Sequence, residues 1–196
     1  MTNSLNAVGN YLLLMNSQKL LNNLDLIMNK MLCFFLFSFL SMCSFGQGYS
    51  DSISVNFFLL EECRISQNIS GEIKYNVEQF SKAGFEFRSY FSGDLSSEEK
   101  IIAFMADYEL NMPYFLDDGK MKQTYYGAEV APEVIVYDEK RQEILYKGRI
   151  DNSYADVGVR RRVVTSRDLR TVLQAIVDGE AIPVKQTKAI GCYLNH

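Results

Sequence analysis

The sequence is nearly devoid of histidine. Its one histidine among 196 residues is His196, the last in the chain. We therefore expect neither a histidine-based metal site nor a Ser-His-Asp triad within one chain, and no cofactor. The net charge of −4 does not point to nucleic acid or to an anionic membrane surface as a partner. The chain also shows no internal repeat and no low-complexity segment.

The N-terminal segment has the form of a targeting signal. Residues 31–46 are almost wholly apolar, follow a lysine and end in small residues before Gln47, as a cleavable secretory signal does. The alternative is a retained membrane anchor. Against it, the run is short for a spanning helix, which needs about 20 apolar residues. We predict an N-terminal extension and signal peptide over residues 1–46 and a mature domain over residues 47–196. That domain would be extracytoplasmic, either periplasmic or secreted.

Cysteine is scarce, and its positions matter more than its number. Cleavage before Gln47 would remove Cys33 and Cys43 and leave Cys63 and Cys192. Disulfides persist in oxidising compartments, so a pair of cysteines left in such a protein is informative.

Hydrophobic periodicity in the mature region predicts an α/β domain. We expect strands at 52–60, 85–91, 128–137 and 143–150, and helices at 65–83, 96–110, 122–126 and 168–177. A strand, a long helix and a second strand imply a right-handed crossover and a parallel pair. The last two strands are joined by a short polar loop and should form an antiparallel hairpin.

The segments between and after these elements carry weaker signals. Residues 114–116 fit either a short strand or a packed loop, and residues 151–164 read as a polar loop with three arginines. Thr165 to Asp168 resembles a capping box at the start of the last helix. The tail over residues 182–194 is too apolar for a free end and should dock on the domain.

Cys63 lies where an apolar strand gives way to a helix. The free N–H groups of a helix start favour negative charge, so a thiol there tends towards a lower pKa and a more reactive thiolate. Arg64 should help, whereas the carboxylates of Glu61 and Glu62 should oppose the thiolate. The alternative is a partly buried cysteine in a scaffold without redox activity.

The order of elements resembles the thioredoxin fold, with a central mixed sheet flanked by helices and the tail docked on the domain. The strand that leads into Cys63 resembles the active-site turn of thioredoxin-like redoxins, and Val130-Ala-Pro132-Glu resembles their cis-proline loop. Further motifs look like the secreted bacterial redoxins of the AhpC/TSA-like group, namely Tyr146 to Asp151, Arg160 to Arg162, Thr165 to Leu169 and Thr187 to Cys192. The resemblance implies that Pro132 is cis and shapes a groove where a partner's extended chain would lie.

The sequence also departs from these families. Thioredoxins carry Cys-x-x-Cys, but Ser66 stands at the second position here, so dithiol chemistry within that motif is impossible. The segment before Cys63 lacks the proline and threonine of the peroxidase motif Pro-x-x-x-Thr-x-x-Cys. Copper-carrying relatives need a second nearby cysteine, where this chain has Gln67.

These observations give three functional hypotheses. The first is an extracytoplasmic redoxin in which Cys63 reacts with protein thiols or disulfides and Cys192 is the resolving cysteine, with Arg64, Ser66 and Pro132 around them. Cys192 could instead form an intermolecular disulfide or remain a free thiol. The second hypothesis is a non-catalytic thioredoxin-like module that binds a partner beside Pro132. The third is a thiol peroxidase acting on a small peroxide. The sequence does not set the oligomeric state.

Overall fold

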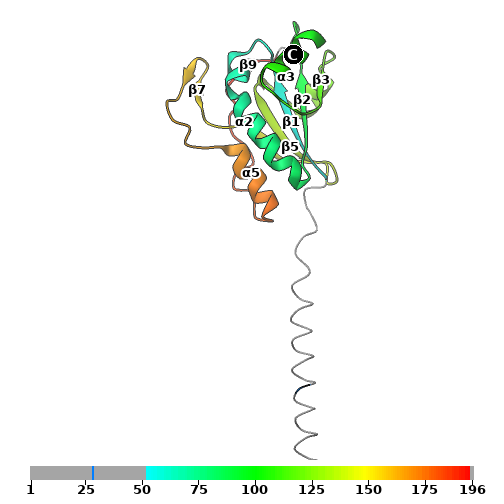
Figure 1. Ribbon diagram of the computed structural model, residues 1–196, viewed down its shortest axis with the longest axis vertical. Helices are drawn as coiled ribbons and strands as arrows, with labels where there is room; N and C mark the ends of the chain where they lie inside the picture. Colours follow the sequence, from blue (N-terminus) through cyan, green and yellow to red (C-terminus); the bar gives the residue numbers. More distant parts are fainter. Residues whose placement is uncertain (1–27, 29–51, 195–196) are drawn as a thin grey trace, which may run out of the picture. The chain divides into compact units, whose positions relative to one another are not determined.

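A five-stranded mixed sheet forms the centre of the domain (Figure 1). The computed structural model describes Met28 and residues 52–194, so the predicted signal peptide and its cleavage site before Gln47 lie outside the described residues. The strand order is β3-β2-β1-β5-β6. The bounds are β1 (Ile53–Leu59), β2 (Glu86–Phe91), β3 (Tyr114–Leu116), β5 (Glu133–Asp138) and β6 (Glu143–Gly148).

Strand β1 is the middle of the sheet, and all seven of its residues are buried. It pairs in parallel with β2, which pairs in parallel with β3, and it pairs antiparallel with β5. Strands β5 and β6 form the predicted antiparallel hairpin. The expected parallel pair is therefore confirmed, and residues 114–116 are a strand rather than a loop.

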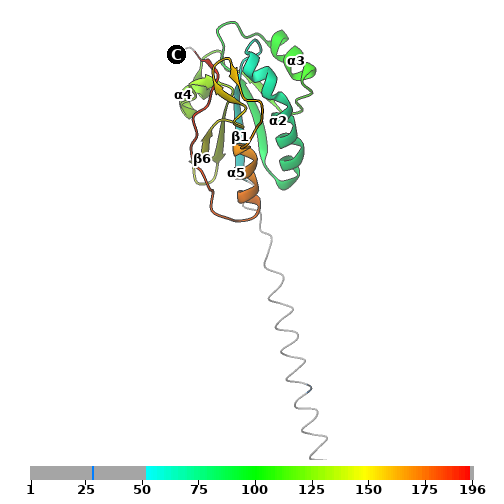
Figure 2. The same cartoon turned by 90° about the vertical axis from the view of Figure 1, so that its left-hand side faces the viewer.

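Helices cover both faces of this sheet (Figures 1 and 2). Their bounds are α2 (Arg64–Phe80), α3 (Glu98–Asp107), α4 (Met121–Tyr126) and α5 (Asp168–Val177). Side chains alternate along β1, so Val55 and Phe57 join the main core with α2, α3 and α5. Phe58 points to the opposite face and packs in a smaller core with Tyr126 of α4.

Two local predictions are wrong. The capping box does not form, because α5 begins at Asp168 with Arg167 as its N-cap, and the Asp168 carboxylate accepts hydrogen bonds from Arg149 instead. Residues 151–164 are not only a loop, since they contain the small hairpin of β7 (Tyr154–Asp156) and β8 (Val159–Arg160). Arg149, the residue after β6, thus binds the carboxylate that the predicted capping box would use.

The tail docks on the domain as predicted, and it does so through backbone pairing. Its strand β9 (Cys192–Tyr193) pairs antiparallel with β4 (Val130–Ala131). Farther back, the tail runs beside β6, where Lys147 N–H donates to the Lys185 carbonyl and Thr187 N–H donates to the Lys147 carbonyl. No helix within the described residues has the length and apolar character needed to cross a bilayer.

The arrangement is the thioredoxin-like α/β fold. A parallel β1-α2-β2 unit is followed by an antiparallel β5-β6 hairpin and a closing helix, α5. The Ala131–Pro132 peptide bond, immediately before β5, is cis, as predicted. This topology brings the end of β1 and the start of β5 together, which places Cys63 beside Pro132.

Candidate redox site at the start of helix α2

Cys63 is the N-cap residue of α2, and the strand-to-helix junction creates this position. Its backbone is extended, with φ −76° and ψ 115°, while the Cys63 carbonyl already accepts the first helical hydrogen bond from Gln67 N–H. The Cys63 side chain makes no capping hydrogen bond to this helix. The first N–H groups of a helix have no partner within the helix, so the start of this 17-residue helix favours negative charge beside it.

Cys63 and Cys192 form a disulfide across 129 positions of sequence. Their Cα atoms are 6.2 Å apart, within the usual range for a disulfide. Cys63 is only 3% exposed and packs against Ile65 and Tyr154, whereas Cys192 is half-buried. The sequence left open an intramolecular disulfide, an intermolecular disulfide and a free thiol for Cys192, and the structure shows the intramolecular bond. Cys192 is the more exposed of the two cysteines.

The residues before Pro132 form the wall against which this disulfide lies. The Sγ atom of Cys63 is 3.2 Å from the carbonyl oxygen of Ala131. In the register of the small sheet, Ala131 is opposite Cys192 and Val130 is opposite Tyr193. The tail therefore crosses the cis-proline loop as an extended strand, with its cysteine directly opposite the residue before the proline.

Gly191 approaches this loop so closely that it has no room for a side chain. A Cβ atom at Gly191 would overlap the carbonyl group of Ala131, since it would be closer to that backbone than real Cβ atoms come. The backbone of the loop cannot move aside as a flexible side chain can. A glycine immediately before the cysteine is thus a steric requirement of the docked tail.

Two of the predicted neighbours of Cys63 serve local structure. Ser66 is fully buried, and its hydroxyl accepts a hydrogen bond from the Leu60 N–H at 3.4 Å, which ties α2 back to the end of β1. The exposed Arg64 donates to Oε1 of Gln67, one helical turn along. The helix start, rather than Arg64, is therefore the positive feature that the structure places at Cys63.

A buried carboxylate lies in the cavity beside the disulfide. This cavity of about 260 Å³ is lined by both cysteines, by Glu61 and by Leu95 and Tyr193, among others. Glu61 is 9% exposed; its Oε2 accepts a hydrogen bond from the Ser96 hydroxyl, and its Oε1 has no hydrogen-bond partner among the described residues. The structure therefore places the side chain of Glu61 in the same cavity as the disulfide, with one of its two oxygens hydrogen-bonded.

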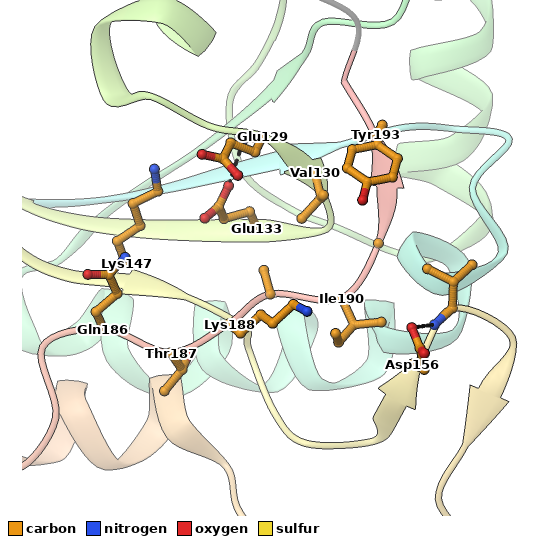
Figure 3. Close-up of a pocket in the computed structure, with 13 residues that line it drawn as sticks. Glu129, Val130, Glu133, Lys147, Asp156, Gln186, Thr187, Lys188, Ile190 and Tyr193 are labelled. Carbon is orange, nitrogen blue, oxygen red and sulfur yellow. Dashed lines mark hydrogen bonds between the residues drawn. The ribbon is translucent and has the colours of Figure 1, made fainter.

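A second and larger cavity, of about 510 Å³, lies beneath the tail (Figure 3). The tail residues Gln186 to Gly191 border one side, and Glu129, Val130 and Glu133 border the other. Figure 3 shows Lys188, Ile190 and Tyr193 on the tail. Between Thr187 and Cys192 the tail thus borders this cavity on one side, while Ile190 packs against the cluster around Cys63.

Thr187 anchors the tail on the far side of this cavity. Its hydroxyl oxygen accepts a hydrogen bond from Arg149 N–H at 3.1 Å and lies 2.6 Å from the Tyr146 hydroxyl. The Tyr146 hydroxyl donates to the Arg149 carbonyl at 2.7 Å, so Thr187 donates to Tyr146. Burial raises the pKa of Tyr146, which keeps this phenol protonated as the network requires.

Sequence reasoning found both cysteines and Pro132, and the structure brings these three together. It missed the pairing partners of the tail, Val130 and Ala131, and the steric role of Gly191. The available signal was the Gly-Cys dipeptide in an apolar tail, which marks a close backbone approach but does not say to what. The three arginines, Arg160 to Arg162, are exposed.

Comparisons with known proteins support the fold and leave the chemistry open. No protein-family model matches this chain, and no curated protein matches it in sequence. Among solved structures, an uncharacterized conserved protein of Geobacillus kaustophilus is 24% identical with a TM-score of 0.66, over 75% of this chain and 78% of that one. A hypothetical protein of Sinorhizobium meliloti is 22% identical with a TM-score of 0.65, over 74% and 80% of the two chains.

A looser likeness involves a secreted disulfide oxidoreductase of Mycobacterium tuberculosis. It is 12% identical, with a TM-score of 0.47, over 66% of this chain and 83% of that one. A likeness this loose does not transfer an activity. The functional assignment for this chain therefore depends on its own site.

Proposed function

We propose that this chain is a thioredoxin-like thiol–disulfide oxidoreductase whose redox couple is Cys63 and Cys192. The observation that carries the proposal is the disulfide between the N-cap of α2 and the tail, opposite Ala131. Cys192 replaces the second cysteine that Ser66 removes from the helix motif. Protein thiols and disulfides are the expected partners.

The geometry supports a definite order of bond changes during reduction of the disulfide. A thiolate of a partner dithiol attacks Cys192, because that end is the more exposed. The Cys63–Cys192 bond breaks, and its electron pair leaves on Cys63, where the helix start stabilises the thiolate. The partner's second thiol then displaces Cys192, which takes a proton, and the partner leaves as a disulfide.

In the opposite direction the reduced protein acts as the nucleophile. The Cys63 thiolate attacks a partner disulfide, forms a mixed disulfide and expels one partner thiolate. Cys192 then attacks the Cys63 sulfur, releases the second partner thiolate and restores the internal bond. Two electrons pass from this chain to the partner in this direction, and no cofactor takes part.

Reaction in an extracytoplasmic compartment is part of the proposal. Disulfides persist there, and residues 31–46 have the form of a secretory signal that would leave residues 47–196 as the mature domain. The Gly-Cys tail further supports a relationship to the AhpC/TSA-like redoxins. Reduction of a small peroxide is a weaker extension, because the peroxidase motif before Cys63 is missing.

The test is equilibration of the protein in thiol–disulfide buffers, followed by alkylation and mass analysis. We expect a reversible two-electron couple that disappears in Cys63→Ser, and accumulation of a mixed disulfide at Cys63 in Cys192→Ser. A disulfide that stays oxidised below about −300 mV would instead be a structural bond.

A structural bond would favour the second candidate, a non-catalytic module that binds a partner beside Pro132. The burial of Cys63 is the observation on its side, since inert structural cysteines are usually buried. Under that function the single cysteine variants would lose stability but would not change partner binding.

A further inference from the structure

Deepening the proposed function, on which this inference rests, we propose that the site where β9 lies admits a partner segment only where glycine precedes the reacting cysteine, so that its substrates are disulfides carrying the sequence Gly-Cys. The docked tail would be the internal copy of that segment. The partner would be a protein with this dipeptide in a disulfide, and its cysteine would take the place of Cys192.

The first support is the backbone pairing. Strand β4 has two residues, Val130 and Ala131, and the tail supplies their antiparallel partners, Tyr193 and Cys192. Leu194 N–H also donates to the Glu129 carbonyl at 3.0 Å. An edge of this kind pairs with any extended chain, because main-chain groups form the bonds and side-chain pockets set the specificity.

The second support is the covalent geometry. Cys192 reaches Cys63 from this strand, so an extended chain in the same register presents its own cysteine to the same sulfur. When the Cys63 thiolate attacks a partner disulfide, the new bond therefore forms in the position that the Cys63–Cys192 bond occupies now. The partner's other sulfur leaves with the electron pair.

The third support is steric and specifies the partner. A Cβ atom at Gly191 would overlap the Ala131 carbonyl group. Any segment in this register meets the same obstacle at the residue before its cysteine. The site therefore selects glycine there and rejects segments with a side chain at that position, which is discrimination by exclusion.

The tail is also arranged so that it can leave. Between the Thr187 anchor and Gly191 it borders the cavity of about 510 Å³, and Lys188 and Tyr193 are exposed (Figure 3). Once the disulfide is reduced, this end keeps the short pairing with β4, the hydrogen bond to Glu129 and the packing of Leu194 in the smaller core. A partner segment and the tail cannot pair with β4 at the same time, so entry of the tail would expel the partner after exchange.

The test uses the full chain with Cys192→Ser in a Cys33→Ser, Cys43→Ser background, so that Cys63 is its single thiol. Two peptides, Ala-Ile-Gly-Cys-Tyr-Leu and Ala-Ile-Ala-Cys-Tyr-Leu, are supplied together as glutathione mixed disulfides under reversible exchange. Intact-mass analysis then reads the ratio of the two adducts on Cys63. We expect the glycine peptide to prevail roughly tenfold, because a group forced into a packed site is disfavoured by about that factor or more. The same peptides on free cysteine provide the reference, where the ratio should be near one.

The outcomes separate the two proposals. Equal adducts of the two peptides would overturn the docking site and leave the oxidoreductase standing. Absence of any adduct would overturn both. A disulfide-linked pair of chains, formed when Cys63→Ser and Cys192→Ser proteins are mixed, would assign the groove to the tail of a second copy instead of a foreign segment.

A variant of the tail gives an independent measurement. Gly191→Ala, in a chain that keeps Cys63 and Cys192, should lower the equilibrium constant for forming their disulfide roughly tenfold in glutathione buffer. Gly71→Ala is the matched control, because a Cβ at Gly71 meets nothing within 4 Å. Equal constants in the two variants would contradict the steric selection.

Discussion

The hydroxyl groups of Tyr146 and Thr187 lie 2.6 Å apart and join strand β6 to the C-terminal tail. Both are bonded in turn to the backbone of Arg149. Tyr146 is fully buried and Thr187 half-buried, so water can replace these hydrogen bonds only in part. The tail is therefore held by a polar anchor at one end and by a disulfide at the other.

Thr187→Val tests the polar anchor, because valine keeps the shape and removes the hydroxyl. We expect a loss of roughly 1–3 kcal/mol in the free energy of unfolding, since the Arg149 N–H loses its acceptor. Urea unfolding of the oxidised protein measures it. Thr171→Val is the control: the Thr171 hydroxyl is exposed and bonds within its own helix, so little change is expected. Equal losses in both variants would contradict the anchor.

The disulfide should be the larger stabilising feature. It closes a sequence separation of 129, and the chain-entropy model gives roughly 4–5 kcal/mol for a loop of this order. We expect Cys63→Ala and Cys192→Ala to lose similar amounts in urea unfolding. The double variant should lose little more than either single one, because all three break the same bond. Additive losses would show that the cysteines stabilise the protein separately.

Glu133 gives a prediction about pH. Burial raises the pKa of Glu133 above its ordinary value of 4.5, against the opposing effects of the Glu129 N–H and Lys147. The folded protein thus binds this proton more tightly than the unfolded chain. The resulting stability is complete below the unfolded pKa and is lost as the pH rises through the folded pKa.

The variant Glu133→Gln should remove that loss. Its free energy of unfolding should fall less than that of the wild type between about pH 4 and about pH 7. Glu143→Gln, at an exposed position on the neighbouring strand, is the control and should follow the wild type. If the free energy of unfolding of Glu133→Gln fell with pH as steeply as that of the wild type, the Glu133 carboxyl would not be the source of this pH dependence.

Glu61 should restrain the reactivity of Cys63. Its carboxylate lines the same cavity as both cysteines, and Oε1 has no hydrogen-bond partner among the described residues. In Cys192→Ser, we expect Glu61→Gln to speed the attack of Cys63 on a small disulfide by roughly threefold to tenfold near neutral pH, because a like charge disfavours the thiolate. Stopped-flow rates with a chromogenic disulfide measure this.

Glu62→Gln is the control for that experiment. Glu62 is exposed, and its carboxylate is 2.7 Å from Lys100 Nζ, so its charge is screened by solvent and by its partner. A smaller effect is expected. If the two variants changed the rate equally, the burial of Glu61 beside Cys63 would not explain the effect.

The elements that the sequence predicted well are those specified by local pattern. The apolar run of β1, the helical spacing of α2 and the hairpin after Pro132 are each specified by a few neighbouring residues. The two-residue strands β4 and β9 have no such signal, because their pairing joins segments about sixty positions apart in the sequence. Their existence depends on the folded domain.

The residues of the candidate site also differ in how far local sequence specifies them. The sequence predicts Cys63 as a candidate reactive thiol because a helix start is a local feature with a known effect on a thiol. Its bond to Cys192 depends on how the tail packs, and the burial of Glu61 depends on how the segment before α3 packs. Hydrophobic periodicity does not specify either of these contacts. Likewise, the Thr165 capping signal lost to Arg149, whose contact with Asp168 exists only in the tertiary structure.

The bonds between the tail and Lys147 have a consequence for solubility. Strand β6 is at the edge of the sheet, and an uncovered edge is a template for pairing with another chain. The tail occupies the Lys147 N–H and carbonyl, and thus acts as a protective cover for this edge. We therefore expect protein that loses the Thr187 anchor to aggregate more readily, because the segment that carries Cys192 also covers this sheet edge.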